Sequence, residues 1–117
     1  DTIMIIKVKM KKTSIIPIPV NKALKMLGQN IKEARIKRRL TLELIAERAG
    51  ISYLTLRNVE KGSHTVSMGI YAKVLFVLGL LDNLYDLANP DKDEVGKILE
   101  SENLPKRVRY KKKKTDE

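Results

Sequence analysis

The apolar residues of the stretch 40–62, LTLELIAERAGISYLTLRNVEKG, recur with the spacing of helices. One set at i, i+3, i+4 and i+7 predicts a first helix and consists of Leu42, Ile45, Ala46 and Ala49. Thr41 precedes this set as an N-cap, and Gly50 follows it where a left-handed backbone commonly ends a helix. A second helix starts after Ser52 and stops at Gly62. Two short helices joined by a tight glycine turn predict a helix-turn-helix.

The second of these helices has two unlike faces. Its apolar residues Ile51, Leu56 and Val59 share one side, which predicts contact with a core. The opposite side is polar and basic, and it carries Tyr53, Leu54, Arg57, Asn58 and Lys61. A polar outer face of this kind is typical of a helix that enters the major groove of DNA.

Further helices are predicted on both sides of this motif, at residues 22–39, 68–78, 82–88 and 93–102. Asn21, Ser67 and Asp82 are expected to cap three of them at the N-terminus. Gly28 lies inside the first of these helices and costs about 1 kcal/mol relative to Ala, so we expect the start of that helix to fray. Pro105 is expected to end the last helix.

The charge of the chain predicts the nature of a partner. The sequence has 24 Lys and Arg against 14 Asp and Glu, which gives a formal net charge of +10. Most of the excess lies at the two ends, between Lys7 and Lys12 and in the run from Lys106 to Lys114, whereas the signs nearly balance in between. An excess of this size predicts a polyanionic partner. The C-terminal run could follow a DNA backbone, dock on an acidic protein face or remain a solvated tail.

The N-terminal segment follows a different pattern from the rest of the chain. Residues 3–10 alternate between two faces and are rich in β-branched side chains, which predicts a short strand; a disordered tail is the alternative. Pro17 and Pro19 then form an extended connector. The expected divisions are an N-terminal strand or arm with its proline linker (1–20), a helix-turn-helix DNA-binding and dimerisation domain (21–104), and a basic tail (105–117).

Composition argues against catalysis and against a membrane span. The chain has no cysteine, which excludes disulfides, a thiolate nucleophile and a cysteine zinc site. His64 is the single histidine and has no nucleophile or metal partner nearby in sequence, so we expect no enzyme activity, no metal and no cofactor. No apolar run approaches the roughly 18 residues of a membrane span. We expect a cytoplasmic protein that is nucleoid-associated through DNA binding.

Residues 27–87 carry a set of recognisable motifs, which are Leu27-Gly28, Ile31, Ala34-Arg35, Leu40-Thr41, Ile45-Ala46, Ala49-Gly50-Ile51-Ser52, Val59-Glu60-Lys61-Gly62 and Leu78-Gly79. With these motifs the chain resembles the phage-repressor-like helix-turn-helix family of the Cro/C1 or Xre type. The resemblance implies an all-α, five-helix lambda-repressor-like domain, to which this chain adds a C-terminal helix and the short N-terminal strand. It also implies a third helix in the major groove of DNA and dimerisation through the fifth.

The resemblance further implies which residues meet DNA. Base edges are assigned to Tyr53, Leu54, Arg57 and Asn58, and phosphates to Thr41, Ser52, Thr55, Lys61 and Arg39. Asn58 suits adenine N6 and N7, Leu54 suits a thymine methyl group, and Arg57 suits either guanine or a phosphate. Tyr53, at the start of its helix, can use its hydroxyl on a phosphate.

Two other positions are compared with the family. Leu42 stands where the family commonly has a phosphate-touching Gln, so Thr41, Lys61 and the basic end of the first helix are expected to supply that contact instead. Arg35 and Glu60 match the family's ion pair between the first and third helices. Removing one member of such a pair strands the other charge, so its expected role is structural.

Residues 71–87 contain more apolar side chains than one stripe of two short helices can bury. The surplus predicts a homodimer interface, which is assigned to Tyr71, Phe76, Leu80, Leu81 and Leu84. A purely internal core is the alternative, because a small domain has few other core residues.

A narrower likeness covers the C-terminal half of the chain. The runs SMGIYAKVLFVLGL and ANPDKDEVGKILESENLPKRVR resemble the HipB-like antitoxin repressors that accompany HipA-like kinases. This likeness implies a dimeric, sequence-specific repressor that binds a palindromic operator with half-sites ~34 Å apart. It also implies a HipA-like kinase toxin as a protein partner. An interaction adaptor or RNA-binding factor that reuses the fold without reading DNA is the alternative.

Overall fold

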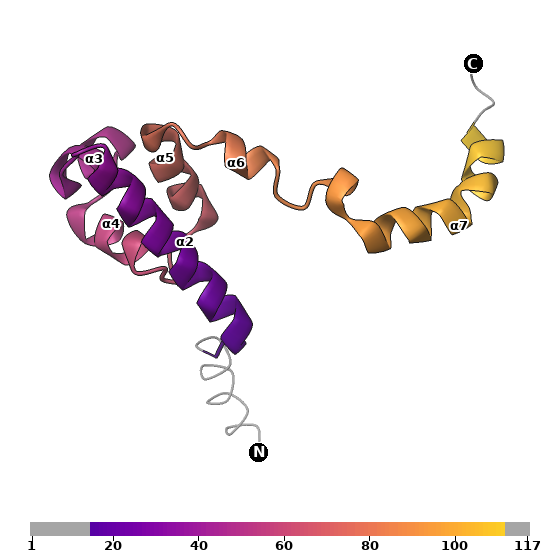
Figure 1. The fold of residues 1–117 in the computed structure, drawn as a ribbon, viewed down its shortest axis with the longest axis horizontal. Coiled ribbons are helices and arrows are strands. Elements are labelled where there is room, and N and C mark those ends of the chain that lie inside the picture. The colour runs from indigo at the N-terminus through magenta and orange to yellow at the C-terminus, as the bar shows by residue number, and fades with distance from the viewer. Residues whose placement is uncertain (1–14, 112–117) are drawn as a thin grey trace, which may run out of the picture. The chain divides into compact units, whose positions relative to one another are not determined.

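The computed structural model describes the backbone of residues 15–111 and the side chains of residues 15–103. Within these residues every regular element is helical (Figure 1), namely α2 (Ile18–Lys37), α3 (Leu42–Ala49), α4 (Tyr53–Glu60), α5 (Met68–Leu78), α6 (Asp82–Tyr85), the 3-10 helix η1 (Pro90–Lys92) and α7 (Glu94–Lys111). The all-α fold is therefore confirmed for this part of the chain. The strand expected at residues 3–10 and the end of the basic tail, residues 112–117, lie outside the described residues.

The chain divides into two compact units, one reaching Leu81 and the other starting at Asp82. The first unit contains α2 to α5, and the second contains α6, η1 and α7. The division falls inside the range 21–104 that was expected to form one domain. The helix-turn-helix and the last two predicted helices therefore belong to different units.

The helices from α3 to α5 begin and end at the predicted residues. The side-chain oxygens of Thr41, Ser52 and Ser67 each accept a hydrogen bond from the backbone N–H three residues later, at 3.1, 3.0 and 3.2 Å. Such caps contribute about 1 kcal/mol each. Left-handed glycines follow α3 and α5, with φ of +69° at Gly50 and +81° at Gly79. These boundaries depend on short-range hydrogen bonds, which explains why sequence alone predicts them.

The start of α2 differs from the predicted one. The helix begins directly after Pro17, and Asn21 lies in the first turn, where its backbone N–H donates to the Pro17 carbonyl at 3.0 Å. Asn21 is therefore not the N-cap. The reason is Pro19, whose ring holds φ near the helical value and whose missing N–H has no partner to lose in a first turn. At its other end α2 stops at Lys37.

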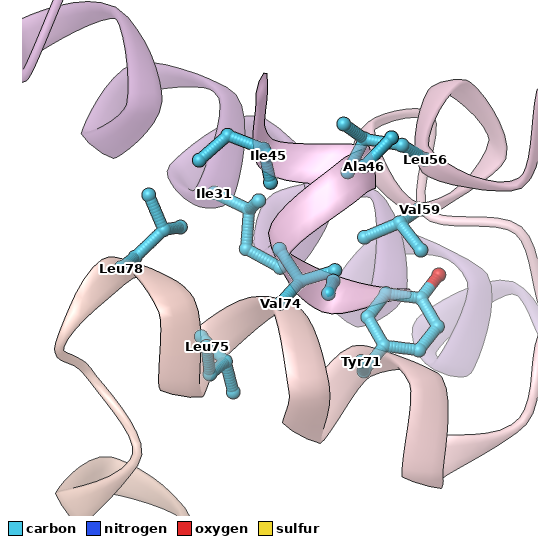
Figure 2. Packing of buried hydrophobic residues seen from close by; sticks show 10 residues of the cluster. Ile31, Ile45, Ala46, Leu56, Val59, Tyr71, Val74, Leu75 and Leu78 are labelled. Atoms are coloured by element: carbon cyan, nitrogen blue, oxygen red, sulfur yellow. The ribbon is translucent and has the colours of Figure 1, made fainter. Parts of the chain in front are cut away.

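The core of the first unit lies between α2, α3, α4 and α5 (Figure 2). Its buried side chains are Ile31, Ile45, Ala46, Ala49, Leu56, Val59, Tyr71, Val74, Leu75 and Leu78. The apolar stripes predicted for the two helices of the motif are part of this set. Full burial of a side chain such as Leu56 or Val59 stabilises the fold by about 1.5–3 kcal/mol. This packing decides which face of α4 points outward.

Two glycines let α2 approach the end of α4 closely. A Cβ added to Gly28 would lie 2.6 Å from the backbone nitrogen of Gly62 and 2.7 Å from the backbone oxygens of Val59 and Glu60. Gly62, with φ of +73°, is packed in the same way against the backbone of Leu24. α2 is helical from Ile18 onward and is anchored to α4 at Gly28, where only glycine leaves room for the contact.

Short-range polar contacts shape the beginning of the second unit. The Asp86 carboxylate accepts hydrogen bonds from the Lys92 ammonium and from Asn89 Nδ2, and these two donors, Lys92 foremost, lower the pKa of Asp86. The helix predicted at residues 82–88 already stops at Tyr85. A turn follows over residues 86–88, in which Ala88 has a φ of +56°, and Asn89 then caps η1 by accepting the Asp91 backbone N–H at 2.9 Å.

α7 is longer than the predicted range 93–102. Its backbone stays helical through Pro105 to Lys111, so the stop expected at Pro105 is wrong. A proline inside a helix removes one hydrogen bond and displaces the preceding turn, which kinks some helices rather than ending them. Figure 1 shows the axis of α7 turning in its C-terminal part. Earlier in the helix three apolar side chains are exposed, namely Val95, Ile98 and Leu99.

Candidate nucleic-acid interface

The outer residues of α4 form two neighbouring rows, each with i, i+4 and i+7 spacing. One row consists of Tyr53, Arg57 and Glu60. The other row consists of Leu54, Asn58 and Lys61. The first row faces α2, because Glu60 bonds Arg35 of that helix. The second row points away from the core, which is occupied by the opposite side of α4.

The ion pair between Arg35 and Glu60 is present, as the family resemblance implied. Arg35 Nε donates to Glu60 Oε2 at 2.7 Å, and Arg35 Nη2 donates to Glu60 Oε1 at 3.1 Å. The remaining nitrogen, Nη1, donates to the Leu40 carbonyl at 3.0 Å. Both side chains of the pair are nearly buried. One guanidinium therefore joins α2, α4 and the loop before α3, and the two-pronged geometry fixes the orientation of α4.

The four residues expected to meet base edges all lie on the outer surface of α4, but in both rows. Leu54 is 67% exposed in the outward row, and Asn58 beside it is half-buried. Tyr53 and Arg57 occupy the row that faces α2, and the Arg57 Cζ lies over the Tyr53 ring at 5.9 Å from its centroid. A guanidinium over an aromatic face is held there by the charge distribution of the ring. Leu54 and Asn58 therefore lie in the outward row, whereas Tyr53 and Arg57 lie in the row that faces α2.

Hydroxyl groups at the starts of α3 and α4 differ in what they can still donate. Ser52 Oγ donates its hydrogen to Thr55 Oγ1 at 2.8 Å while it accepts the Thr55 backbone N–H. Within this pair only the Thr55 hydroxyl hydrogen is left for an outside acceptor. Thr41 Oγ1 accepts a hydrogen bond from the backbone N–H of Leu44, so the hydrogen of the Thr41 hydroxyl can likewise be donated to an outside acceptor. Thr41 and Thr55 are thus better suited to donate to phosphate than Ser52, although all three were expected to do so.

Arg39 lies in a turn rather than in the helix that was predicted to reach it. Its φ is +55°, in a region that costs L residues other than glycine about 1–2 kcal/mol. The backbone N–H groups of Arg39 and Leu40 donate to the carbonyls of Ile36 and Arg35, the bond pattern of a Schellman motif. Glycines occupy this position after α3, α4 and α5, whereas α2 places an exposed cation there, just before α3. Lys61, the remaining residue expected to bind phosphate, is also exposed.

A hollow lies between α2 and the row of α4 that faces it. Its lining is mostly basic and consists of Lys25, Gln29, Lys32, Arg57, Glu60 and Lys61. The three α2 residues were not among the expected site residues. Their i, i+4 and i+7 spacing is visible in the sequence, but only the packing of α2 on α4 brings them to the surface that Arg57 and Lys61 share.

The residues expected to form a dimer interface do not lie on one face. Tyr71 is 6% exposed, and its hydroxyl donates to the Ser63 carbonyl at 2.7 Å, which corrects its expected place in the interface. Burial also raises the pKa of Tyr71. Leu80 packs against the edge of the core, whereas Phe76 is 68% exposed and lines a mainly apolar groove with Leu81. Leu84 belongs to the second unit.

Two kinds of feature are absent from the described residues. Between residues 15 and 111, no helix has both the length and the apolar character needed to cross a membrane. Among the described side chains, no group of three or more His, Cys, Asp or Glu is placed to hold a metal ion.

Comparison with known proteins identifies the central part of the chain. Residues 31–80 match the family model described as Helix-turn-helix. No curated protein and no solved structure gave a match. The matched range contains the end of α2 and all of α3, α4 and α5, and therefore includes the whole outer face of α4. The match supports the resemblance to phage-repressor-like proteins and the description of the chain as a DNA-binding regulator: residues 31–80 form a helix-turn-helix domain.

Proposed function

We propose that this protein is a sequence-specific transcriptional repressor that binds a palindromic operator as a homodimer. The observation that carries the proposal is Leu54, a 67% exposed leucine on the polar outer face of α4. Scattered exposed leucines are common, but this one lies in a row with Asn58, on the helix that the motif presents to a major groove. The Leu54 side chain can make an apolar contact with a thymine methyl group, whereas it cannot hydrogen-bond a polar group.

The outward row of α4 is suited to reading bases directly. The amide of Asn58 can accept from adenine N6 and donate to adenine N7, which distinguishes A·T from the other pairs in the major groove. Leu54 lies one turn earlier in the same row. The groove is about 12 Å wide and admits one helix, so neighbouring base pairs can face both side chains.

Groups around the outward row are suited to hold the DNA backbone. The hydroxyls of Thr41 and Thr55, together with Lys61 and Arg39, offer donors at or near the starts and ends of the two motif helices. Contacts of this kind position a protein on the duplex without reading its sequence. We assign them that role here.

Dimerisation is proposed through apolar residues near the end of the first unit, of which Phe76 is exposed, and through Leu84 of the second unit. Phe76 and Leu81 line an apolar groove, and Leu80 and Leu84 follow the same stretch of chain. Two-fold symmetry would place two copies of α4 in successive major grooves about 34–36 Å apart.

Footprinting on the promoter of the protein's own gene tests the proposal. We expect a protected site with two inverted half-sites, and sedimentation should give a dimer at the same concentration. Equal affinity for the promoter and for a scrambled duplex of the same composition would refute sequence-specific repression. Tight and selective binding to RNA instead would favour the alternative of an RNA-binding factor.

A HipA-like kinase toxin is the proposed protein partner, and this part rests on the likeness of residues 67–80 and 88–109 to HipB-like antitoxins. Co-expression of the chain with a kinase encoded next to it should relieve the growth arrest that the kinase causes alone. The same rescue by a variant in which Leu54 and Asn58 are both alanine would show that neutralisation needs contact with the kinase and not DNA binding. Failure of the wild-type chain to rescue or to bind the kinase would refute the antitoxin role.

A further inference from the structure

Apart from Glu60, the side chains that line the hollow between α2 and α4 are basic or neutral. Lys25 and Lys32 stand at its α2 side with Gln29 between them, and Arg57 and Lys61 stand at its α4 side. The hollow is open to solvent, so it suits a group that is part of a larger molecule better than an enclosed small ligand.

Glu60 also lines the hollow but does not cancel this charge. Both of its carboxylate oxygens accept hydrogen bonds from Arg35, at 2.7 and 3.1 Å, and its side chain is nearly buried. Its charge is therefore matched by Arg35, which is not part of the lining. The exposed lining is left with four cations and one amide, all of which can donate hydrogen bonds.

The spacing of the hollow is held by the backbone. Gly28 and Gly62 bring α2 and the end of α4 into contact, and Lys25 lies at this contact, because a Cβ on Gly62 would come within 2.6 Å of the Lys25 Cα. The Arg35–Glu60 pair joins the same two helices about two turns further along α2. A hollow between two helices joined in this way needs little rearrangement to receive a ligand.

Arg57 is oriented toward this hollow and away from the outward row. It belongs to the row of α4 that faces α2, and the Tyr53 ring one turn earlier in that row lies under its guanidinium. Asn58 and Leu54, in the outward row, are the residues left for base edges.

We infer that the hollow is a binding site for a phosphate group of the DNA backbone, with Arg57 as its central donor together with Lys25 and Lys32. The inference rests on the proposed DNA-binding function and deepens it, because it moves Arg57 from base recognition to backbone recognition and extends the interface onto α2. A guanidinium can donate two parallel hydrogen bonds to a phosphate, and two lysines beside it add charge without directional demands. The site contributes affinity and not sequence preference.

The first experiment compares three variants of the full chain, Arg57→Gln, Lys25→Gln/Lys32→Gln and Lys92→Gln. The last removes one exposed positive charge from η1, outside both the hollow and the apolar groove, and serves as the matched control. Affinity is measured over a range of salt concentrations on the operator and on a scrambled duplex. Loss of one phosphate contact should lower the slope of log K against log salt by about 0.9.

The site predicts that Arg57→Gln and the double variant flatten this slope on both duplexes and leave the ratio of operator to scrambled affinity unchanged. Lys92→Gln should keep the wild-type slope. A fall in the affinity ratio caused by Arg57→Gln would overturn the inference, because Arg57 would then be reading a base. If Arg57→Gln or the double variant had the same slope as Lys92→Gln, the inference would be overturned as well.

A titration with inorganic phosphate tests whether the hollow binds a phosphate group of the DNA backbone or a free phosphate ion. Amide shifts around Gln29 and Arg57 are recorded by NMR while phosphate is added without DNA. Saturating shifts in the wild type, combined with an unchanged operator slope in the variants, would assign the hollow to a free phosphate and overturn the backbone assignment. If the wild type proves unable to prefer its operator, the repressor proposal fails, but the slope on scrambled duplex still tests the hollow.

Discussion

The two units of this chain differ in how their apolar residues are used. In the first unit, ten buried side chains from α2 to α5 form one core, and capped helices surround it. In the second unit, none of the described side chains of residues 82–103 is buried, and Val95, Ile98 and Leu99 are exposed on α7. Stability is therefore expected to come from the first unit, and the apolar surface of the second is better explained by association.

The largest expected effect is on the contact that joins α2 to α4. Gly28→Ala should lower the free energy of unfolding by about 3 kcal/mol, because the new Cβ meets backbone atoms of α4 that have no room to move. Thermal or urea denaturation measures it. Gly69→Ala in α5 is the matched control: its Cβ would meet only Ser67 Oγ at 3.8 Å, and it should keep or raise stability. Equal stability of the two variants would contradict the close packing of α2 and α4.

A smaller loss is expected at Tyr71, the one core residue with a polar group. Tyr71→Phe removes the hydrogen bond to the Ser63 carbonyl and should cost about 1 kcal/mol. The variant should keep the dimer, because Tyr71 lies inside one chain. If the Tyr71→Phe variant were monomeric, Tyr71 would belong to the dimer interface despite its burial.

The raised pKa of Tyr71 predicts a pH dependence of stability. The folded state holds the tyrosine proton more tightly than the unfolded state, whose pKa is near the ordinary value of 10.0. The contribution to stability is therefore complete below pH 10 and is lost as the pH rises through the higher folded pKa. The free energy of unfolding of the wild type should fall above pH 10. In Tyr71→Phe the part of this fall that comes from Tyr71 should be absent. The same pH profile in both proteins would show that Tyr71 does not couple folding to this proton.

Arg39 offers a change with opposite effects on folding and on binding. Arg39→Gly should stabilise the fold by about 1 kcal/mol, because glycine adopts a φ of +55° without steric cost. The same change should weaken binding to operator and scrambled duplex alike, since a cation beside the start of α3 is lost. Denaturation and binding titrations on one preparation measure both effects. Unchanged DNA affinity would remove Arg39 from the interface.

The smallest effect on stability is expected in the second unit. Ile98→Ser replaces a side chain that is 59% exposed and should change the free energy of unfolding of the first unit by less than about 0.5 kcal/mol. If α7 takes part in association, the dimer or the complex with a protein partner should weaken instead. A large loss of stability would show that α7 packs into a core.

Sequence reasoning succeeded where structure depends on near neighbours and failed where it depends on contacts across the fold. Thr41, Ser52, Ser67 and Gly50 act within one helical turn, so their roles as caps and as a helix end were predictable. The ion pair of Arg35 with Glu60 spans 25 residues and was predicted only through the family resemblance. The core stripe of α4 followed from periodicity alone.

The missed features have physical causes of the same kind. Gly28 looked like a weak point because its cost in a helix is local, whereas its contact with Gly62 belongs to a different helix. Arg39 was placed in a helix because no glycine marks the end of α2, and an arginine takes the left-handed position instead. The hollow lined by Lys25 and Arg57 depends on how two helices pack, which no single stretch of sequence contains.

The most direct test of the central claim is the affinity of Asn58→Ala for an operator with single base-pair changes, compared with Asn83→Ala on α6 as a control. The wild type should prefer its operator to scrambled duplex, and Asn58→Ala should lose about 1–3 kcal/mol of discrimination at one base pair while keeping the wild-type salt dependence. Asn83→Ala should behave as the wild type. A wild-type protein that binds scrambled duplex as tightly as its operator, or an Asn58→Ala variant that weakens every sequence equally, would contradict base reading by α4.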